Sequence, residues 1–314
     1  MTNRLAALGM AFIVAMTGAG STAAQSEAAR GGGVRVLGYG WLATNDTLGD
    51  NQDRWRTGSL TVSAAFGKEW TGRAPSRPFD LWELRLQGQV IGPSDLTRYN
   101  PTDRPYAGML SLGVHTHVVR DGVEFTLGGD LVVIGPQTGL DQRQDGLHSI
   151  FGMPRPAPAV LARQIPNTVR PTAVAEIAHS YDFGGAARIR PFAEMRAGDE
   201  TLLRVGADVS FGAFGDGGLM ARESVTGQRY RVVGYPDPGF SLVMGGDIAH
   251  VANSVYLPES RGHDLTPRRD RLRAGLRWQG ENLWAFYGIS WLGREFEAQP
   301  EGQLVGSVSL RLRF

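Results

Sequence analysis

Polar side chains that could support hydrolysis occur in three short clusters of this 314-residue chain. The clusters are residues 44–46 (Thr-Asn-Asp), residues 53–58 (Asp-Arg-Trp-Arg-Thr-Gly), and the pair Gln144 and His148. A neutral His148 imidazole can accept a proton from water near pH 7, because the ordinary pKa of histidine lies close to that pH. Asp46 offers the hard carboxylate oxygens that Ca²⁺ prefers, and loop carbonyls could complete the coordination.

These residue types fit one reaction. A cation held by Asp46 would polarise an ester carbonyl, and Asn45 and Thr57 could donate hydrogen bonds to the resulting oxyanion. The set predicts ester hydrolysis by metal-assisted attack of water. A simpler interpretation stays open, since Asn-Asp pairs are common in turns, Thr is common at strand starts, and a single loop histidine is often solvated.

Composition and motifs exclude several other chemistries. The chain has no Cys, which excludes disulfides, thiolate metal sites and cysteine nucleophiles. It has no Gly-x-Ser-x-Gly elbow and no glycine-rich nucleotide fingerprint. The formal net charge is +1, so no global field favours nucleic acid, and we expect no nucleic-acid partner. His115 and His117 share one strand face, where they could bind a metal or line an interior.

The elements that must position these clusters are strands, because many segments of about ten residues alternate between apolar and polar side chains. The expected strands are residues 34–44, 57–67, 81–91, 107–119, 122–134, 171–183, 187–198, 201–212, 238–250, 268–279, 282–293 and 303–314. In the last strand, Leu304, Val308, Leu310, Leu312 and Phe314 fall on one face, and Ser307, Ser309, Arg311 and Arg313 on the other. A final alternating strand that ends in Phe resembles the assembly signature of outer-membrane barrels.

The sequence thus predicts an all-β fold, a transmembrane antiparallel β-barrel of about 12 strands. Tight-turn dipeptides at 121–122, 184–185 and 280–281 predict short periplasmic turns. Long connections at 45–56, 92–106, 135–170 and 251–267 then fall on the extracellular side, where barrels carry long loops. Two connections disagree with this asymmetry: residues 213–237 would form a long periplasmic segment, and residues 199–200 a very short external turn. Residues 141–152 lack strand alternation, so we expect a short helix in an extracellular loop, ended by the following prolines.

The N-terminal residues carry an export pattern. A positive start at Arg4, an apolar stretch over residues 6–19 and small residues up to Ala24 predict a signal peptide at residues 1–24. Residues 25–314 would then form a single barrel domain. Beyond the signal peptide, the sequence has no apolar run of about 18 residues that would predict a membrane-spanning helix.

Several stretches together resemble the lipid A 3′-O-deacylase family, the LpxR-like outer-membrane deacylases. Residues 103–108 (Asp-Arg-Pro-Tyr-Ala-Gly) look like one family motif, and residues 133–136 with Gly139, Gln144 and His148 look like its Gly-x-x-Gly-Pro … Gln-x-x-x-His run. Asn45-Asp46 and residues 54–60 are similar to two further segments, with Thr57 on the family threonine. The resemblance covers nearly the whole mature chain, and residues 103–148 are its most specific part.

The resemblance implies a twelve-stranded barrel that removes the 3′-linked acyloxyacyl group of lipid A with the help of Ca²⁺. By position, His148 would be the base, Asp46 the metal ligand, and Asn45 and Thr57 the remaining site residues. The partner would be lipopolysaccharide of the outer leaflet of the cell outer membrane, and we expect a monomer with no protein partner. Lipid A is anionic, so Arg54 and Arg104, with Arg56 and Arg98, could hold its phosphates; they could equally be ordinary interfacial or interior arginines.

The chain departs from the family pattern at two places. Trp55-Arg56 replaces the usual aromatic pair before Thr57, and Ser59 disturbs the spacing that follows. A Glu that some members carry shortly after the histidine has no match, because Pro154 and Arg155 occupy that stretch. If that Glu helps to hold the cation, then Asp141, Asp145 or Asp50 could substitute for it.

Three functions remain to be separated. The first is a Ca²⁺-dependent lipid A deacylase, and the second is a non-enzymatic barrel, such as a narrow pore, an adhesin or a structural protein. A hydrolase of other outer-leaflet esters, such as phospholipids, would share the site of the first. The enzyme needs Asn45, Asp46, Thr57 and His148 to converge on one pocket, whereas a passive barrel predicts that they are scattered.

Overall fold

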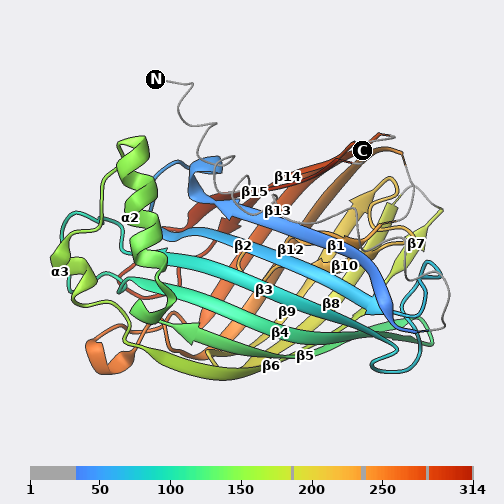
Figure 1. Cartoon of the computed structure of the whole chain (residues 1–314), viewed down its shortest axis with the longest axis horizontal. Coiled ribbons are helices and arrows are strands. Elements are labelled where there is room, and N and C mark those ends of the chain that lie inside the picture. Colours follow the sequence, from blue (N-terminus) through green and yellow to red (C-terminus); the bar gives the residue numbers. More distant parts are fainter. Residues whose placement is uncertain (1–32, 185–186, 235–237, 281–282, 313–314) are drawn as a thin grey trace.

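The strands close into one antiparallel β-barrel in the computed structural model, which describes residues 33–184, 187–234, 238–280 and 283–312 (Figure 1). The expected signal peptide at residues 1–24 and the terminal Phe314 lie outside the described residues. Within those four ranges, no helix has the length and apolar character needed to cross a membrane.

Twelve long strands form the barrel wall, which confirms the predicted count. They are β1 (Arg35–Asn45), β2 (Trp55–Gly67), β3 (Leu81–Gly92), β4 (Ala107–Arg120), β5 (Val123–Ile134), β6 (Thr168–His179), β8 (Ala187–Ala197), β9 (Glu200–Phe211), β12 (Gly239–Ser254), β13 (Arg268–Gln279), β14 (Leu283–Leu292) and β15 (Gln303–Leu312). Neighbours along the chain pair with one another, β1 pairs with β15, and pairing of β6 with β8 completes the circle. The short β7 (Tyr181–Phe183) adds to the edge of β8.

The barrel is apolar outside and polar inside, as the alternation predicts. On β4, Leu110, Leu112 and Val114 are exposed on the outward face, whereas Ser111 and His115 are buried inside. Register extends this pattern around the wall, because residues paired across antiparallel strands point to the same side. An apolar exterior is stable only against lipid, so the strands are the membrane-spanning elements.

Short turns join the strands at one end. Asp121 and Gly122 both have positive φ values, 51° and 80°, as the favoured two-residue hairpin requires. Gly184 also has a positive φ of 65°, while the rest of the predicted turns at 184–185 and 280–281 lies partly outside the described residues. The very short external turn is real too, because β8 ends at Ala197 and β9 begins at Glu200.

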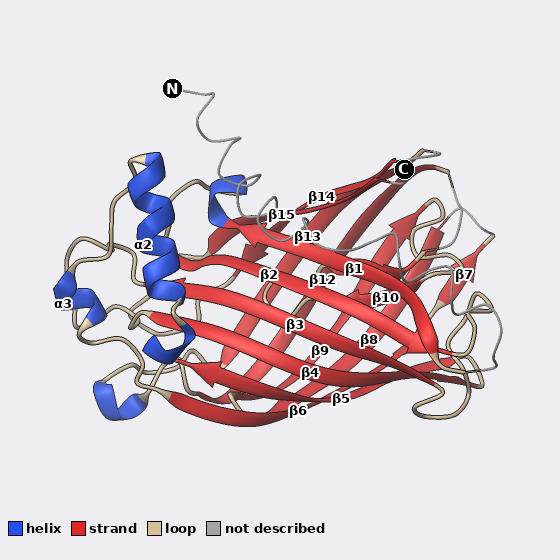
Figure 2. Cartoon of the chain, in the orientation of Figure 1, coloured by secondary structure: helices blue, strands red, loops and turns tan. Residues whose placement is uncertain are grey.

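The helices gather at the other end of the barrel (Figure 2). They are α2 (Leu140–Phe151), α3 (Pro158–Leu161) and three 3-10 turns, η2 (Asp46–Leu48), η3 (Pro136–Thr138) and η4 (Glu259–Arg261). The helix predicted at 141–152 is therefore confirmed within one residue at each end.

Residues 213–234 do not form a long periplasmic loop, which corrects one of the two connections that disagreed with the expected asymmetry. They fold back into the barrel as a hairpin, β10 (Leu219–Arg222) and β11 (Arg229–Val233). Gly40 of β1 allows the close approach, because a Cβ there would lie 2.1 Å from the Arg231 carbonyl oxygen. The hairpin stays buried because its apolar side chains meet the inner wall.

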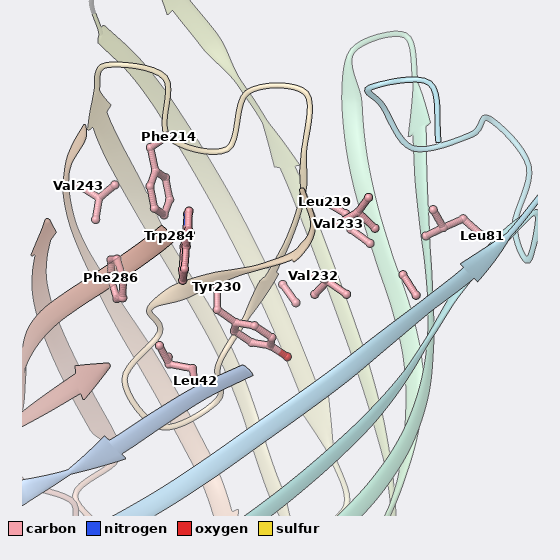
Figure 3. Packing of buried hydrophobic residues seen from close by; sticks show 12 residues of the cluster. Leu42, Leu81, Phe214, Leu219, Tyr230, Val232, Val233, Val243, Trp284 and Phe286 are labelled. Carbon is pink, nitrogen blue, oxygen red and sulfur yellow. The ribbon is translucent and has the colours of Figure 1, made fainter. Parts of the chain in front are cut away.

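Figure 3 shows this contact, in which Tyr230 and Val232 of β11 lie among Leu42, Trp284 and Phe286 of the wall. Tyr230 and Val232 have no exposed surface, and the Tyr230 hydroxyl lies 2.6 Å from Ser63 Oγ of β2. The hairpin therefore occupies the lumen next to the short-turn end.

Ion pairs fill much of the remaining interior. Arg222 of the hairpin binds Glu176 of β6 at 2.6 Å and Asp208 of β9 at 2.9 Å. His115 and His117 face inward, where their Nε2 atoms lie 2.9 Å from Asp130 and 2.7 Å from Glu83. These two histidines belong to the lumen lining, one of the two roles that their spacing left open.

We expect Leu112→Arg to lower the free energy of unfolding by about 2–4 kcal/mol, because it places a charge on the lipid face near the middle of β4. The measurement is guanidinium unfolding in phospholipid vesicles, followed by tryptophan fluorescence. Leu112→Ala serves as the control, since it removes apolar surface without adding charge. Equal losses in the two variants would mean that this face does not contact lipid.

Candidate active site

The predicted loop helix α2 lies against the outward face of the barrel wall, across the outer ends of the strands (Figure 1). Gly108 of β4 makes the contact possible, since a Cβ there would lie 2.5 Å from Thr138 Oγ1 and 3.0 Å from Leu140 Cβ. The helix begins after Gly139 and ends at Gly152, which both have positive φ values, 64° and 67°. Sequence and local geometry thus fix both where α2 sits and where it stops.

A groove that is open to solvent runs between α2 and the wall. The helix lines it with one face, on which residues follow at intervals of three or four. They are Leu140, Arg143, Gln144, Leu147 and His148. The wall contributes mainly small or apolar residues of β1, β2, β3 and β15, which are Ala43, Gly58, Gly88, Val90 and Val308. Because the groove lies on the outward face, its open side is the side of the membrane lipid.

The His148 ring is buried and held by one hydrogen bond. It is 4% exposed, and its Nδ1 lies 2.5 Å from the Pro154 carbonyl oxygen. A carbonyl can only accept, so Nδ1 carries a proton, and Nε2 can accept a hydrogen bond when the ring holds no second proton. Nε2 lies 3.6 Å from Asp53 Oδ2, and both residues line the groove.

Gln144 lies one helical turn before His148, and a hydrogen bond from the barrel side of the helix holds its side chain. The Tyr106 hydroxyl donates a 2.7 Å hydrogen bond to Gln144 Oε1. Tyr106 is 1% exposed and packs with Leu96 and Val160. The tyrosine of the Asp-Arg-Pro-Tyr-Ala-Gly stretch therefore fixes the active face of α2 against the wall.

Asn45 and Thr57 lie opposite the helix, at the outer ends of β1 and β2. Asn45 Oδ1 accepts from the Thr47 amide at 2.8 Å, and Asn45 Nδ2 donates to the Thr57 carbonyl at 3.1 Å. The Thr57 hydroxyl is buried and has no hydrogen-bond partner among the described residues. Asn45 thus ties the two strand ends together, and Thr57 keeps a free donor beside the groove.

Asp46 lies directly behind these residues and is fully buried. Its Oδ2 accepts a 2.8 Å hydrogen bond from the Arg54 amide, and its Oδ1 has no partner among the described residues. Burial, followed by the negative charge of Asp53, raises the pKa of the Asp46 carboxyl well above its usual range. Burial likewise raises the pKa of Asp53, which the nearby His148 partly offsets.

Three buried carboxylate oxygens in this loop therefore lack a donor in the part of the chain that the structure describes: Asp46 Oδ1, Asp50 Oδ1 and Asp53 Oδ2. Oxygen ligands of this kind suit a hard divalent cation. Within the described ranges, no three His, Asp or Glu side chains converge tightly enough to form a ready-made cage. A cation here would need backbone carbonyls and water for its remaining ligands, as the sequence predicts for Asp46.

The loop that carries these carboxylates is strained. Asn51, Asp53 and Trp55 have positive φ values, 59°, 48° and 50°, which side chains other than glycine rarely adopt. Trp55 is 1% exposed and packs with Leu257 and Phe296, so tertiary contacts hold the loop in this conformation. Backbone strain of this kind commonly marks a functional site.

The structure does not bring Arg54 and Arg104 to the groove. Arg54 pairs with Glu301 at 2.7 Å and with Asp50 at 3.1 Å. Arg104 is 1% exposed and pairs with Glu295 at 2.6 Å. Both guanidinium groups are occupied inside the protein, which is the interior role that the sequence left open for them.

Two of the three candidates to replace the missing family Glu also lie elsewhere. Asp145 pairs with Arg155 on the outer side of α2, and Asp141 accepts from the Gln142 amide at the start of the helix. Asp50 lies near Asp46, whose pKa its charge helps to raise. The sequence pattern indicates no role for Asp53, although this residue belongs to the second polar cluster. Only the turn of the strained loop brings it to His148.

A closed barrel with an apolar exterior and a groove that opens sideways to lipid defines an outer-membrane barrel with a lateral site. The family model described as "Outer membrane protein LpxR" matches residues 8–314. The chain therefore belongs to the LpxR family and is a protein of the cell outer membrane.

One solved structure shares the fold, and two others are more distantly similar. LpxR from Salmonella typhimurium is similar at a TM-score of 0.71 and 18% identity, covering 88% of this chain and 99% of that one. The NanC porin has a TM-score of 0.40 and 6% identity, covering 89% and 100% of the two chains. The translocator domain of the autotransporter NalP from Neisseria meningitidis has a TM-score of 0.39 and 11% identity, covering 98% and 94%. A search of the curated proteins gives no match.

We expect Asp46→Asn to raise the free energy of unfolding by about 1–3 kcal/mol at pH 8 when a chelator removes divalent cations. Since the folded pKa of Asp46 is raised, folding favours its protonated form, and that stabilisation is lost as pH rises through the folded pKa. Asn mimics the neutral form and can still accept from the Arg54 amide.

The measurement is denaturant unfolding of both proteins in detergent with chelator, at pH 8 and at pH 4. The gain should shrink at pH 4, where the wild-type carboxyl is protonated. A loss of stability at pH 8 would contradict the idea that an uncompensated charge is buried there.

Proposed function

We propose that this protein is a lipid A 3′-O-deacylase, which hydrolyses the 3′-linked acyloxyacyl ester of lipopolysaccharide in the outer leaflet. Membership of the LpxR family supports this class of activity. The observation that carries the proposal is the His148 ring, held through Nδ1 by the Pro154 carbonyl, at a groove that opens to the lipid side of the barrel. An outer-leaflet lipid can enter such a groove without leaving the membrane.

In the proposed reaction, His148 Nε2 accepts a proton from water, and the water oxygen attacks the ester carbonyl carbon. The Thr57 hydroxyl donates to the carbonyl oxygen as it becomes an oxyanion. Asn45 keeps Thr57 in place through the Thr57 carbonyl. His148 then returns the proton to the leaving sugar oxygen. The products are a free acyloxyacyl acid and a lipid A with a free 3′ hydroxyl.

Asp53 has a role in the same step. The imidazolium that forms on proton transfer would lie 3.6 Å from Asp53 Oδ2, and a neighbouring carboxylate favours the charged ring. Tyr106 and Gln144 do not touch the reacting atoms in this scheme. They are positioning residues that hold the helix face carrying the base.

The loop carboxylates fit a Ca²⁺ ion in donor type, and we propose that Asp46 and Asp53 hold it, with backbone carbonyls and water as the remaining ligands. When bound, such an ion would polarise the ester carbonyl and neutralise the carboxylate charges. Asp53 would then take the place of the Glu that this chain lacks after its histidine.

A passive barrel gives no reason for Asn45, Asp53, Thr57 and His148 to line one groove. A phospholipid hydrolase would use the same residues, so the choice between the two ester substrates depends on the assay.

Lipid A from cells that express the wild-type chain should lose the mass of the 3′ acyloxyacyl group, and this loss should require Ca²⁺. We expect His148→Asn to reduce the conversion at least about 100-fold, the contribution typical of a general base. Mass spectrometry of extracted lipid A is the measurement. His250→Ala, on the exposed outward face of β12, is the matched control and should convert normally.

Unchanged lipid A with a folded, inserted wild-type barrel would overturn the deacylase. Release of fatty acid from phospholipids in the same cells would then identify the alternative ester substrate.

Metal binding can be measured without turnover. Tb³⁺ is a luminescent substitute for Ca²⁺, and Trp55, two residues from Asp53, can excite it. We expect Asp53→Asn to weaken Tb³⁺ binding on the order of tenfold, since affinity in such sites follows the number of charged ligands. The control is Asp145→Asn, because Asp145 pairs with Arg155 on the other side of α2. Equal Tb³⁺ affinity in the wild type and Asp53→Asn would remove Asp53 from the ligand set.

A further inference from the structure

One cation of the groove has no ion-pair partner among the residues that the structure describes. Arg143 is exposed, and it is the only Lys or Arg among the residues that line the groove. No carboxylate of the described residues lies within ion-pair distance of its guanidinium. Its backbone amide donates within the helix to Gly139, so its position on α2 is fixed even though its side chain is not.

Other arginines near the site are used differently. Arg54, Arg56 and Arg104 are buried and pair with Glu301 or Glu295. Arg155, on the other side of α2, pairs with Asp145. A protein that neutralises these arginines internally but leaves one at the open groove presents a binding site for an anion of its substrate.

We infer that Arg143 binds the phosphate that neighbours the scissile ester on the sugar and so positions this ester at His148. The inference rests on the proposed function. In lipid A the 3′ ester and the 4′ phosphate stand on adjacent ring carbons, so a group that fixes the phosphate also fixes the ester. Arg143 precedes His148 by five residues, about 7.5 Å along the helix axis, a separation that an arginine side chain can span.

Arginine suits this task because its planar guanidinium can donate two parallel hydrogen bonds to phosphate oxygens. Leu140 and Leu147 flank it on the same helix face and would contact the acyl chains. The sugar phosphate would thus contact the Arg143 guanidinium, and the acyl chains would contact apolar side chains. The scissile carbonyl would lie between the phosphate and the chains. Arg143 is a positioning residue in this scheme, since it does not touch the reacting atoms.

The test compares lipid A that carries the 4′ phosphate with the same lipid A after a phosphatase has removed it. With the phosphorylated substrate, Arg143→Gln should raise KM about tenfold and change kcat less than about threefold, as expected for the loss of a charge-assisted contact. With the dephosphorylated substrate, Arg143→Gln and wild type should be equal. Arg143→Lys should recover part of the affinity, because it restores charge without the planar fork.

Two controls make the outcome interpretable. Arg170→Gln removes an exposed arginine of β6 that does not line the groove, and it should leave KM unchanged. The shift in gel mobility between unheated and heated samples shows that each variant is a folded barrel. An equal KM increase with both substrates, or no increase with either, would overturn the inference.

A binding assay separates this inference from the proposed function. The His148→Asn variant, with and without Arg143→Gln, is titrated with both forms of lipid A and tryptophan fluorescence is followed. Tighter binding of the phosphorylated form that depends on Arg143 would support the phosphate site even if the wild type released no acyl group. Binding independent of the phosphate or of Arg143 would reject the site whether or not the enzyme is active.

Discussion

The packing of α2 on the outward face of the barrel wall is the contact on which the rest of the site depends. It brings His148 opposite the ends of β1 and β2, and it exists because Gly108 has no side chain to hold the helix off. Tyr106 secures the same contact by a hydrogen bond to Gln144 beneath the helix. If α2 did not pack on the wall, Asn45 and Thr57 would be exposed at the outer ends of their strands, and His148 would not lie opposite them.

Charge is distributed in two ways in this molecule. Inside the lumen, arginines and carboxylates pair with one another, as Arg222 does with Glu176 and Asp208, and the pairs join the hairpin to the wall. At the groove, by contrast, carboxylate oxygens of Asp46 and Asp53 are buried without donors among the described residues. Buried charge without a partner is costly, and proteins rarely keep it except where a ligand compensates it. The paired charges of the lumen therefore fit a structural role, whereas the unpaired carboxylate oxygens at the groove fit a role in binding a ligand.

Much of the fold could be predicted from the sequence, because strand alternation and tight-turn dipeptides are local signals. The twelve wall strands, the helix at 141–152 and the Asp121-Gly122 hairpin all follow from such signals. The lumen hairpin could not be predicted, since the folding back of residues 213–234 depends on the space inside a closed barrel. Local sequence patterns in that segment cannot predict that it enters the lumen.

The candidate site was predictable in part for the same reason. Asn45, Thr57 and His148 lie at strand ends or on a helix face, so the topology alone places them at the outer rim, and the structure brings them to one groove. Asp53 lies close to His148 because the loop is strained, and no turn motif in the sequence predicts the positive φ values of that loop. The internal pairing of Arg54 and Arg104 depends on Glu301 and Glu295, which lie far away in sequence.

The position of the groove also bears on how a substrate would arrive. The hairpin and its ion pairs occupy the lumen, whereas the groove is bounded by outward-facing residues such as Ala43 and Val90. A lipid that diffuses in the outer leaflet can therefore reach His148 along the barrel surface with its acyl chains still in an apolar environment. Only the ester and the sugar phosphate need to leave the lipid headgroup region, and they would meet the loop carboxylates and Arg143 there. A barrel that works this way needs its strands as a rigid wall between the lipid and the polar lumen, and the chain divides its apolar and polar residues in that way.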